Sequence, residues 1–178
     1  MPYFGAADAA YIIRGMRLRD VSTWRGAGVA VPMFSLRSEK SFGVGDFADL
    51  KLLADWCVKT GQNIIQILPI NDTTMTRTWK DSYPYNANST IALHPLYINL
   101  EAAGTLKKKA DRERFAALQA ELNALPQVDY ERALRAKFEY LQILFTESGA
   151  KTLRSKDYKA FVAANEGWLT PYAVYSVL

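Results

Sequence analysis

The sequence predicts an α/β protein built on a strand–helix–strand unit with parallel strands. Two short apolar runs, residues 28–34 and 63–70, show almost no polar alternation, which is typical of strands buried on both faces. Between them lies a segment whose apolar residues repeat at helical spacing. This order of elements predicts a βαβ unit, because parallel neighbours need a crossover connection.

Each element of this unit has its own signals. The first run reads Gly-Val-Ala-Val-Pro-Met-Phe and predicts a strand, although Pro32 lacks a backbone donor. Asp46 stands where a helix N-cap is expected, and Gly61 stands in the C′ position that ends the helix. The apolar face of the helix is formed by Phe47, Leu50, Leu53, Ala54 and Cys57. The second strand reads Asn-Ile-Ile-Gln-Ile-Leu-Pro-Ile over 63–70.

The rest of the chain is predicted as one long loop followed by helices. Residues 71–94 show neither period, and a loop of this length is usually functional. Residues 96–100 are expected to be a short extended segment. Beyond Gly104 the pattern is helical, with apolar stripes at Phe115, Leu118 and Leu122 and at Leu134, Phe138, Leu141 and Phe145. Helix starts are predicted at Asp129, at Ser155 and at the pair Thr170-Pro171.

Three regions are therefore expected: a lead-in over 1–27, a βαβ part over 28–100 and a helical subdomain over 101–178. The last helix pattern runs to Leu178 with no stop signal, so we expect the helical subdomain to be truncated there. Two parallel strands that need cover on both faces do not form a stable sheet alone. The sequence is accordingly expected to be the N-terminal part of a larger α/β enzyme.

Composition excludes several classes of protein. Of 178 residues, 49% are hydrophobic and 22% charged, which is typical of globular proteins. The net charge of +4 is spread along the chain, so we expect no nucleic-acid partner. No apolar run approaches the roughly 20 residues that cross a bilayer, so no membrane partner is expected. A single cysteine, Cys57, fits a reducing, cytoplasmic setting.

The loop over 71–94 has a composition suited to sugars. It combines flat rings (Trp79, Tyr83, Tyr85) with short polar side chains (Asp72, Asp81, Ser82, Asn86, Asn88). A pyranose has an apolar C–H face that lies on a ring and an edge of hydroxyls that need hydrogen bonds. The alternative is a surface loop that is anchored by its aromatic residues.

Catalysis by this chain alone is not expected. Glycosyl transfer needs two carboxylates that face each other across the glycosidic bond. Only Asp72 and Asp81 qualify by position, and both lie in turn contexts where Asp usually bonds its own backbone. With one histidine, His94, a His-rich metal site or a Ser-His-Asp hydrolase contained wholly in this chain is not expected. His94 is expected to make a local structural hydrogen bond, and Cys57 to pack in the core.

Three runs resemble the 4-α-glucanotransferases of glycoside hydrolase family 77, also called amylomaltases or disproportionating enzymes. They extend from Gly28 to Asp46, from Gln66 to Thr74, and from Asp81 to Asn86, which reads Asp-Ser-Tyr-Pro-Tyr-Asn. The resemblance covers residues 24–100, and more loosely Val128-Asp-Tyr and Trp168-Leu-Thr-Pro-Tyr. It is closest to the branch in which starch-binding modules precede the catalytic domain, so residues 1–27 are expected to be a linker.

This resemblance implies a fold and a set of site residues. It implies a partial TIM (β/α)8 barrel, with 28–34 and 63–70 as the first two strands, followed by a mainly helical inserted subdomain. Tyr85 matches the tyrosine under the sugar at the donor subsite, and Ser82 matches a serine beside it. Asp81 and Tyr83 complete the predicted substrate-binding set, and Tyr83 is an insertion relative to the shorter family motif. The catalytic aspartate and glutamate would belong to later strands.

The function that the resemblance implies is retaining transfer of α-1,4-glucan segments between maltooligosaccharides by double displacement, without a metal or organic cofactor. This chain would supply part of the donor site and be inactive alone. Two alternatives are a non-catalytic carbohydrate-binding module and a helical protein-interaction domain formed by 105–178. Because the two strands lack neighbours, the isolated chain is also expected to hide them, either by self-association or by repacking its helices across them.

Overall fold

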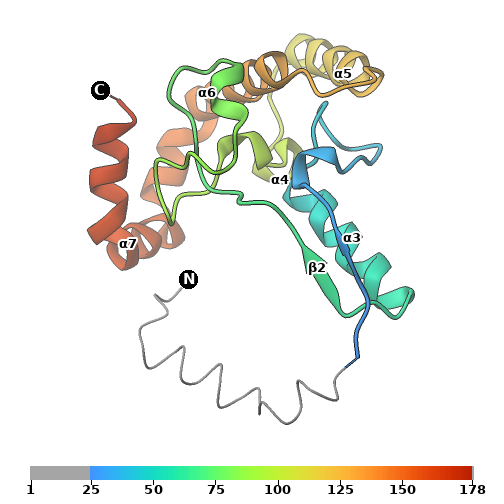
Figure 1. The fold of residues 1–178 in the computed structure, drawn as a ribbon. Coiled ribbons are helices and arrows are strands. Elements are labelled where there is room, and N and C mark those ends of the chain that lie inside the picture. Colours follow the sequence, from blue (N-terminus) through green and yellow to red (C-terminus); the bar gives the residue numbers. More distant parts are fainter. Residues whose placement is uncertain (1–24, 178) are drawn as a thin grey trace.

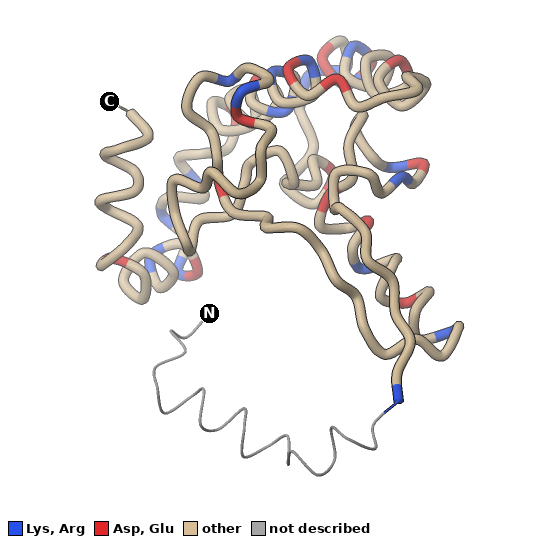
Figure 2. The backbone as a smooth tube through the Cα atoms, in the orientation of Figure 1, with Lys and Arg blue, Asp and Glu red and all other residues tan. Residues whose placement is uncertain are grey.

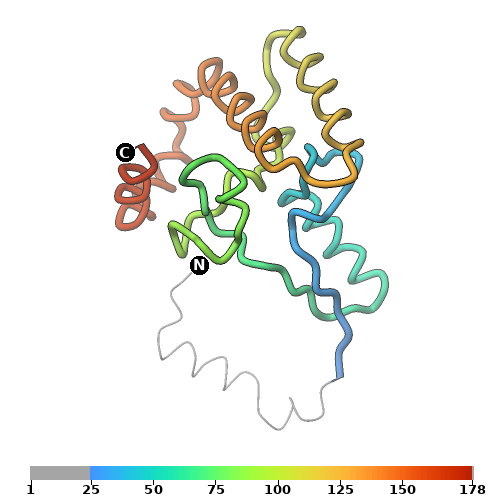
Figure 3. The backbone as a smooth tube through the Cα atoms, turned by 45° about the horizontal axis from the view of Figure 1, so that its top comes forward, coloured from blue at the N-terminus to red at the C-terminus, as the bar shows by residue number. Residues whose placement is uncertain are grey.

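Residues 25–177 are described by a computed structural model of the chain (Figure 1). The predicted lead-in over 1–27 thus lies almost entirely outside the described residues. The fold is mixed α/β, with two short strands and a larger helical part (Figures 1 and 3).

The predicted βαβ unit is confirmed. Strands β1 (Gly28–Ala30) and β2 (Ile64–Gln66) pair in parallel with Gly28 opposite Ile64, and helix α3 (Phe47–Lys59) connects them. The expected lengths of the strands, over 28–34 and 63–70, are wrong. The ladder ends where Val31 donates its N–H to the Gln66 carbonyl, because the next residue, Pro32, has no N–H to donate. The chain then turns into the 3-10 helix η1 (Met33–Ser35).

Helix α3 begins and ends where the sequence predicted. The Asp46 carboxylate accepts the N–H groups of Ala48 and Asp49, and the Asp49 carboxylate accepts the N–H of Asp46, which together form a capping box. Gly61 follows the C-cap with a φ of 72°, the left-handed conformation that glycine adopts freely. Cys57 is buried, as expected, whereas Leu52, Trp56 and Val58 are exposed.

The helical part wraps around the long loop. It contains η3 (Pro95–Tyr97), α4 (Leu100–Ala103), α5 (Lys109–Asn123), α6 (Tyr130–Arg154) and α7 (Lys156–Tyr175). In both ribbon and tube views the βαβ unit extends to one side and α7 lies on the other, with the loop that follows β2 between them (Figures 1 and 3). The predicted caps are confirmed, because the Asp129 and Ser155 side chains accept the first free N–H groups of α6 and α7.

The hydrophobic core lies in this helical part. Side chains from η1, the segment before α3, η3 and helices α4 to α6 form one buried cluster, which contains Met33, Phe42, Val44, Leu96, Tyr97, Leu100, Leu106, Phe115, Leu122, Tyr130, Ala133, Leu134 and Ala136. The predicted stripe residues Phe115, Leu122 and Leu134 are therefore in the core, but Phe145 is exposed. The core holds the two ends of the long loop next to α6.

Two predicted elements are wrong. Residues 96–100 are not extended, because Pro95 occupies the first turn of η3 and the His94 and Asn99 side chains cap η3 and α4. Thr170-Pro171 does not start a helix, because Pro171 lies inside α7, which has already begun at the Ser155 cap. A proline in that position lacks the N–H that would bond the carbonyl of Gly167, four residues earlier.

Charged residues occur mainly on the helices and are sparse on the strands (Figure 2). Lys, Arg, Asp and Glu alternate along α5 and α6, whereas β1 and β2 contain none of them. Among residues 25–177, no helix combines the length and the apolar character needed to cross a membrane.

Candidate functional site

The loop over 71–94 begins and ends at the same place, just beyond the carboxyl end of β2. Asn71 and Leu93 form an isolated antiparallel bridge. The N–H of Asp72 donates to the carbonyl of Ala92 at 2.9 Å, and the N–H of His94 donates to the carbonyl of Ile70 at 2.9 Å. The loop is therefore closed at its base. In α/β proteins this edge of the sheet is where ligands usually bind.

Asp72 ties the two arms of the loop together. Its Oδ1 accepts the N–H of Thr74 at 2.9 Å, and its own carbonyl accepts the N–H of Asn88 at 2.7 Å. The Asn88 side chain then donates to the carbonyl of Thr74 at 2.7 Å. The other carboxylate oxygen, Oδ2, accepts the hydroxyl of Tyr172 on α7 at 2.6 Å. Asp72 is buried, and both of its oxygens are thus engaged in holding structure.

Asp81 has a similar role in the middle of the loop. It lies in the 3-10 helix η2 (Trp79–Ser82), and its Oδ2 accepts the N–H groups of Met75, Thr76 and Arg77 at 3.0, 2.8 and 2.6 Å. Burial alone would raise the pKa of this carboxyl group, but these hydrogen bonds lower it below its ordinary value. The bond to Arg77 also holds that residue at a φ of 57°, in the left-handed region.

The four predicted substrate-binding residues are neighbours with different surroundings. Asp81 is buried and faces the backbone. Ser82 is half-buried and donates to the carbonyl of Trp79 at 2.8 Å. The rings of Tyr83 and Tyr85 are 61% and 62% exposed, with their centroids 5.5 Å apart. The loop thus presents two adjacent, accessible rings, and its carboxylate points inwards.

A pocket of about 370 Å³ opens beside these residues. Ser82 and Pro84 form part of its wall, while Tyr83 and Tyr85 lie outside its lining. The exposed ring of Trp79 also lines the pocket and packs on the ring of Tyr130, with centroids 5.9 Å apart. The backbone N–H of Trp79 donates to Glu131 on α6 at 2.9 Å. Further lining residues come from η1, the segment after β2 and the turn before α6, and include Phe34, Pro69, Asn71, Thr73, Gln127 and Val128.

A buried histidine supports the floor of the pocket. His94 Nδ1 accepts the N–H of Leu96 at 3.1 Å, which confirms the expected local hydrogen bond and leaves the ring proton on Nε2. Nε2 lies 3.0 Å from the hydroxyl of Tyr130 and donates to it. Burial lowers the pKa of His94, although Asp72 and Asp81 act in the opposite direction. Because Nδ1 accepts and Nε2 donates, the ring is held in one orientation, and it positions the Tyr130 ring beside Trp79.

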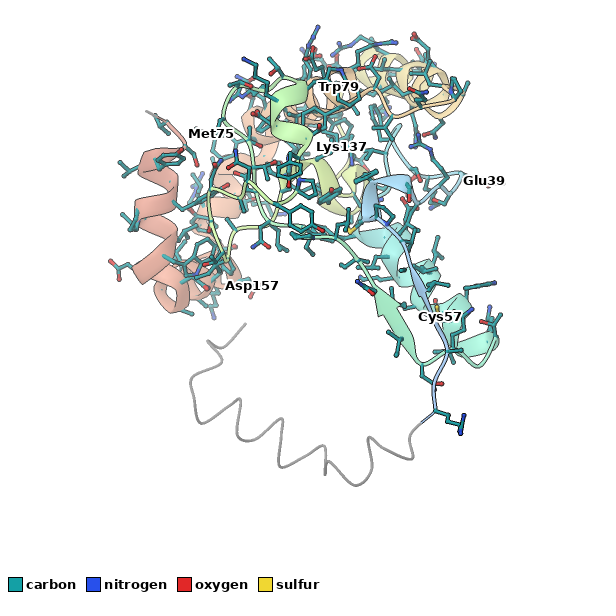
Figure 4. The ribbon with its side chains drawn as sticks, in the orientation of Figure 1. Glu39, Cys57, Met75, Trp79, Lys137 and Asp157 are labelled. Carbon is teal, nitrogen blue, oxygen red and sulfur yellow. The ribbon has the colours of Figure 1, made fainter. Side chains whose placement is uncertain are left out.

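Lys137 holds the segment that carries this histidine. Its side chain is 1% exposed and lies deep in the molecule, well below Trp79 (Figure 4). Nζ donates to the carbonyls of Leu96 and Ile98 at 2.7 and 2.8 Å. Burial lowers the pKa of Lys137 to about 8, against the opposing effect of Asp46 and Asp49.

The two carboxylates of the loop are both engaged with the backbone. Asp72 and Asp81 both accept backbone N–H groups, as the turn contexts predicted, so neither is free to face a glycosidic bond. Among residues 25–177, no three His, Cys, Asp or Glu side chains come together as metal ligands would. What the arrangement can do is present rings and hydroxyl groups to a neutral, polyhydroxylated ligand.

Sequence reasoning missed the half of the pocket that lies outside the loop. Tyr130 lines the pocket and contacts His94 from 36 positions away. Outside the pocket, Tyr172 reaches Asp72 from 100 positions away. The available signals were Tyr130 directly after the Asp129 cap and Tyr172 next to Pro171. Both lie in the runs that resemble the family, but neither run indicates a contact partner.

The sequence of the chain is similar to those of known proteins. The family model described as 4-alpha-glucanotransferase matches residues 31–178. The chain is 44% identical over 157 residues to the 4-alpha-glucanotransferase DPE2 of Oryza sativa subsp. japonica, which covers 88% of this chain and 16% of the rice protein. It is 37% identical over 151 residues to the 4-alpha-glucanotransferase of Chlamydia caviae, covering 83% of this chain and 27% of that protein.

A third relative has a lower identity to this chain. The chain is 31% identical over 135 residues to the 4-alpha-glucanotransferase of Haemophilus influenzae, covering 72% of this chain and 19% of that protein. The chain therefore spans well under a third of the length of these three relatives. The family match includes all the residues that line the pocket, from Phe34 in η1 to Tyr130 at the start of α6. By this match, the chain belongs to the 4-alpha-glucanotransferase family.

Proposed function

We propose that this chain is part of an enzyme that transfers α-1,4-glucan segments between maltooligosaccharides. The transfer is by retaining double displacement, in which a carboxylate holds the glycosyl group and a second sugar's 4-hydroxyl then takes it. The loop over 71–94 supplies part of the donor-sugar site. The family match over 31–178 supports the reaction class, since the relatives bear the name 4-alpha-glucanotransferase.

The observation that best supports a donor-sugar site is the adjacent, exposed pair of rings at Tyr83 and Tyr85. Both rings follow Asp81 closely in the chain, and the Asp81 carboxylate holds the preceding part of the loop by accepting the N–H groups of residues 75–77. Ser82 and Trp79 stand beside them at the edge of a pocket large enough for a sugar residue. In this proposal Tyr85 contacts the apolar face of the donor sugar, and Ser82 borders the same subsite. Asp81 serves the site through the backbone that it holds.

The fold supports the proposal as well. Two parallel strands joined by α3 have the topology of the first two strands of a (β/α)8 barrel, and the loop follows the carboxyl end of the second strand. We propose that the helices from α4 onwards form the subdomain inserted after these strands. A stand-alone carbohydrate-binding module is disfavoured, because the parallel pairing needs covering elements on both faces. We also propose that starch-binding modules precede this segment, as the resemblance to that branch implies.

The reaction is tested with maltotriose as the sole substrate. The full-length protein should produce glucose together with longer maltooligosaccharides, which chromatography separates. Glucose and maltose without any longer product would indicate hydrolysis and contradict the proposal. The 178-residue chain, purified free of host enzymes, should convert nothing, because both candidate carboxylates bond the backbone. Conversion in proportion to this chain would overturn its assignment as a binding part alone.

A further inference from the structure

We infer that Tyr172 is a positioning residue for the sugar-binding loop, and that it acts from α7 through Asp72. This inference rests on the proposed function of the loop over 71–94. The hydroxyl of Tyr172 donates to Oδ2 of Asp72 at 2.6 Å, across 100 residues of chain. A short hydrogen bond to an ionised carboxylate is among the stronger polar contacts in proteins.

The hydrogen bond is an isolated anchor for α7. No residue of α7 is buried, although the helix extends from Lys156 to Tyr175. In the part of the chain that the structure describes, its other side-chain hydrogen bonds stay within the helix or its caps. The contact between Tyr172 and Asp72 is thus the polar link from α7 to the loop. Figures 1 and 3 both show α7 lying alongside that loop.

Asp72, which accepts this hydrogen bond, also forms hydrogen bonds with both arms of the loop. Asp72 accepts the N–H of Thr74 through Oδ1 and the N–H of Asn88 through its carbonyl, and it donates its own N–H to Ala92. A rotation of the carboxylate away from Tyr172 would move Oδ1 as well, because the two oxygens share one carbon. The hydroxyl of Tyr172 therefore fixes the carboxylate orientation on which the Thr74 bond depends.

The phenol is suited to this task over the whole neutral range. Burial, together with the bond to Asp72, raises the pKa of Tyr172 to about 12. The hydroxyl consequently stays protonated and keeps donating. Its ring also packs against Trp168 one turn earlier, with centroids 6.2 Å apart, which limits its rotation. The side chain is held on one side by its own helix and on the other by Asp72.

The test compares two tyrosines of the same helix in the full-length protein. Tyr172→Phe removes the hydroxyl that bonds Asp72. Tyr175→Phe removes a hydroxyl from a side chain that is 51% exposed and that, within residues 25–177, makes no hydrogen bond to the loop. Hydrogen exchange of the Thr74 and Asn88 amides should become faster in Tyr172→Phe and stay unchanged in Tyr175→Phe. The KM for maltotriose should rise about tenfold in Tyr172→Phe with kcat nearly constant, since a charged hydrogen bond is lost and binding weakens uniformly.

A second variant shows whether Tyr172 acts through Asp72. Asp72→Ala should raise KM at least as much as Tyr172→Phe, and adding Tyr172→Phe to it should produce no further change. Additive effects of the two substitutions would overturn the route through Asp72. Unchanged exchange of the Thr74 and Asn88 amides in Tyr172→Phe would overturn the inference outright.

The kinetic readout separates this inference from the proposed function. In one outcome, Tyr172→Phe speeds hydrogen exchange in the loop but leaves KM unchanged, while Tyr85→Ala lowers activity. This result overturns the positioning role of Tyr172 and leaves the sugar site intact. In another outcome, Tyr172→Phe speeds hydrogen exchange in the loop, but neither Tyr172→Phe nor Tyr85→Ala changes the kinetics. This result overturns the sugar site, and it overturns the positioning role as well because that role depends on the site.

Discussion

Asp81 and Tyr85 are four residues apart and have opposite surroundings. The carboxylate of Asp81 is buried and accepts three backbone N–H groups, whereas the ring of Tyr85 is 62% exposed. One residue stabilises the loop and the other is available to a ligand. Substitutions at the two positions should therefore separate stability from activity.

Tyr85→Ala in the full-length protein should lower kcat/KM far more than it lowers stability. A ring that packs on a sugar contributes on the order of 0.5–1.5 kcal/mol beyond burial, which is about two- to twelvefold in rate. Tyr85→Phe should be milder, because the ring remains. Steady-state kinetics on maltooligosaccharides, paired with thermal melts, provide the measurement. Tyr175→Ala removes an equally accessible ring from α7 and is the control; equal kinetic losses in both variants would argue against a sugar contact at Tyr85.

For single residues, hydrogen bonds to nearby positions in the chain could be predicted from the sequence, whereas contacts between distant positions could not. The sequence predicted that Asp72 and Asp81 bond their own backbone and that His94 bonds locally, because these bonds reach only a few residues. The bond from His94 to Tyr130 was not predictable, since it depends on how α6 packs against η3. The pocket floor consists of such contacts, so the sequence indicated only its loop side.

Helix α7 shows how a proline can be accommodated within an element. Pro171 lies inside the helix, and Gly167, four residues earlier, has no side chain to cover the carbonyl that lacks a partner. The same pair of residues weakens the helix, because glycine costs more backbone entropy than alanine does.

Gly167→Ala should stabilise α7 by about 0.5–1 kcal/mol. A Cβ at this position would meet no atom within 4 Å, so the gain in helix propensity is not offset by a clash. Slower hydrogen exchange of the α7 amides would show the effect. Gly149→Ala on α6 is the matched control, since its Cβ would lie 2.6 Å from Cδ2 of Phe145 and should give no gain. A stabilisation of equal size at both glycines would contradict the explanation.

Among the elements, helix starts were predicted best and strand ends worst. The caps at Asp46, Asp129 and Ser155 were correct because a cap is a contact between neighbours in the chain. The strands were predicted too long because their length depends on partners, and the ladder ends at Pro32. The Thr170-Pro171 pair has the composition of a helix start, but α7 begins earlier in the chain, at the Ser155 cap.

The stability of the whole molecule should increase between pH 7.5 and pH 9.5 in a way that depends on Lys137. In the fold its pKa is about 8, and in the unfolded chain it returns to about 10.5. The unfolded state thus binds more protons in this range, so raising the pH favours the folded state. The neutral amine still donates to Leu96 and Ile98. Compared with Lys137→Met, the wild-type chain should gain about 1–2 kcal/mol in urea unfolding over this interval; a constant difference would contradict the buried charge.

The isolated 178-residue chain should self-associate through its βαβ unit. Leu52, Trp56, Val58 and Ile64 are 55%, 47%, 78% and 44% exposed, and two strands leave unpaired edges. Light scattering coupled to size exclusion at micromolar concentration should give a mass above that of one chain, and ANS should become fluorescent. Val58→Lys on the exposed side of α3 should reduce both signals. A compact monomer that leaves ANS dark would show that these residues need no cover.

The burial of Cys57 gives this protein an internal reporter. It is the single cysteine of the sequence, and its side chain is 4% exposed on the helix that joins β1 to β2. A thiol reagent can reach it only when α3 separates from the elements around it. The rate of modification in native buffer therefore measures how often the βαβ unit opens, separately from unfolding of the helical core. No label or additional mutation is needed, because every modified molecule carries the reagent at one known position.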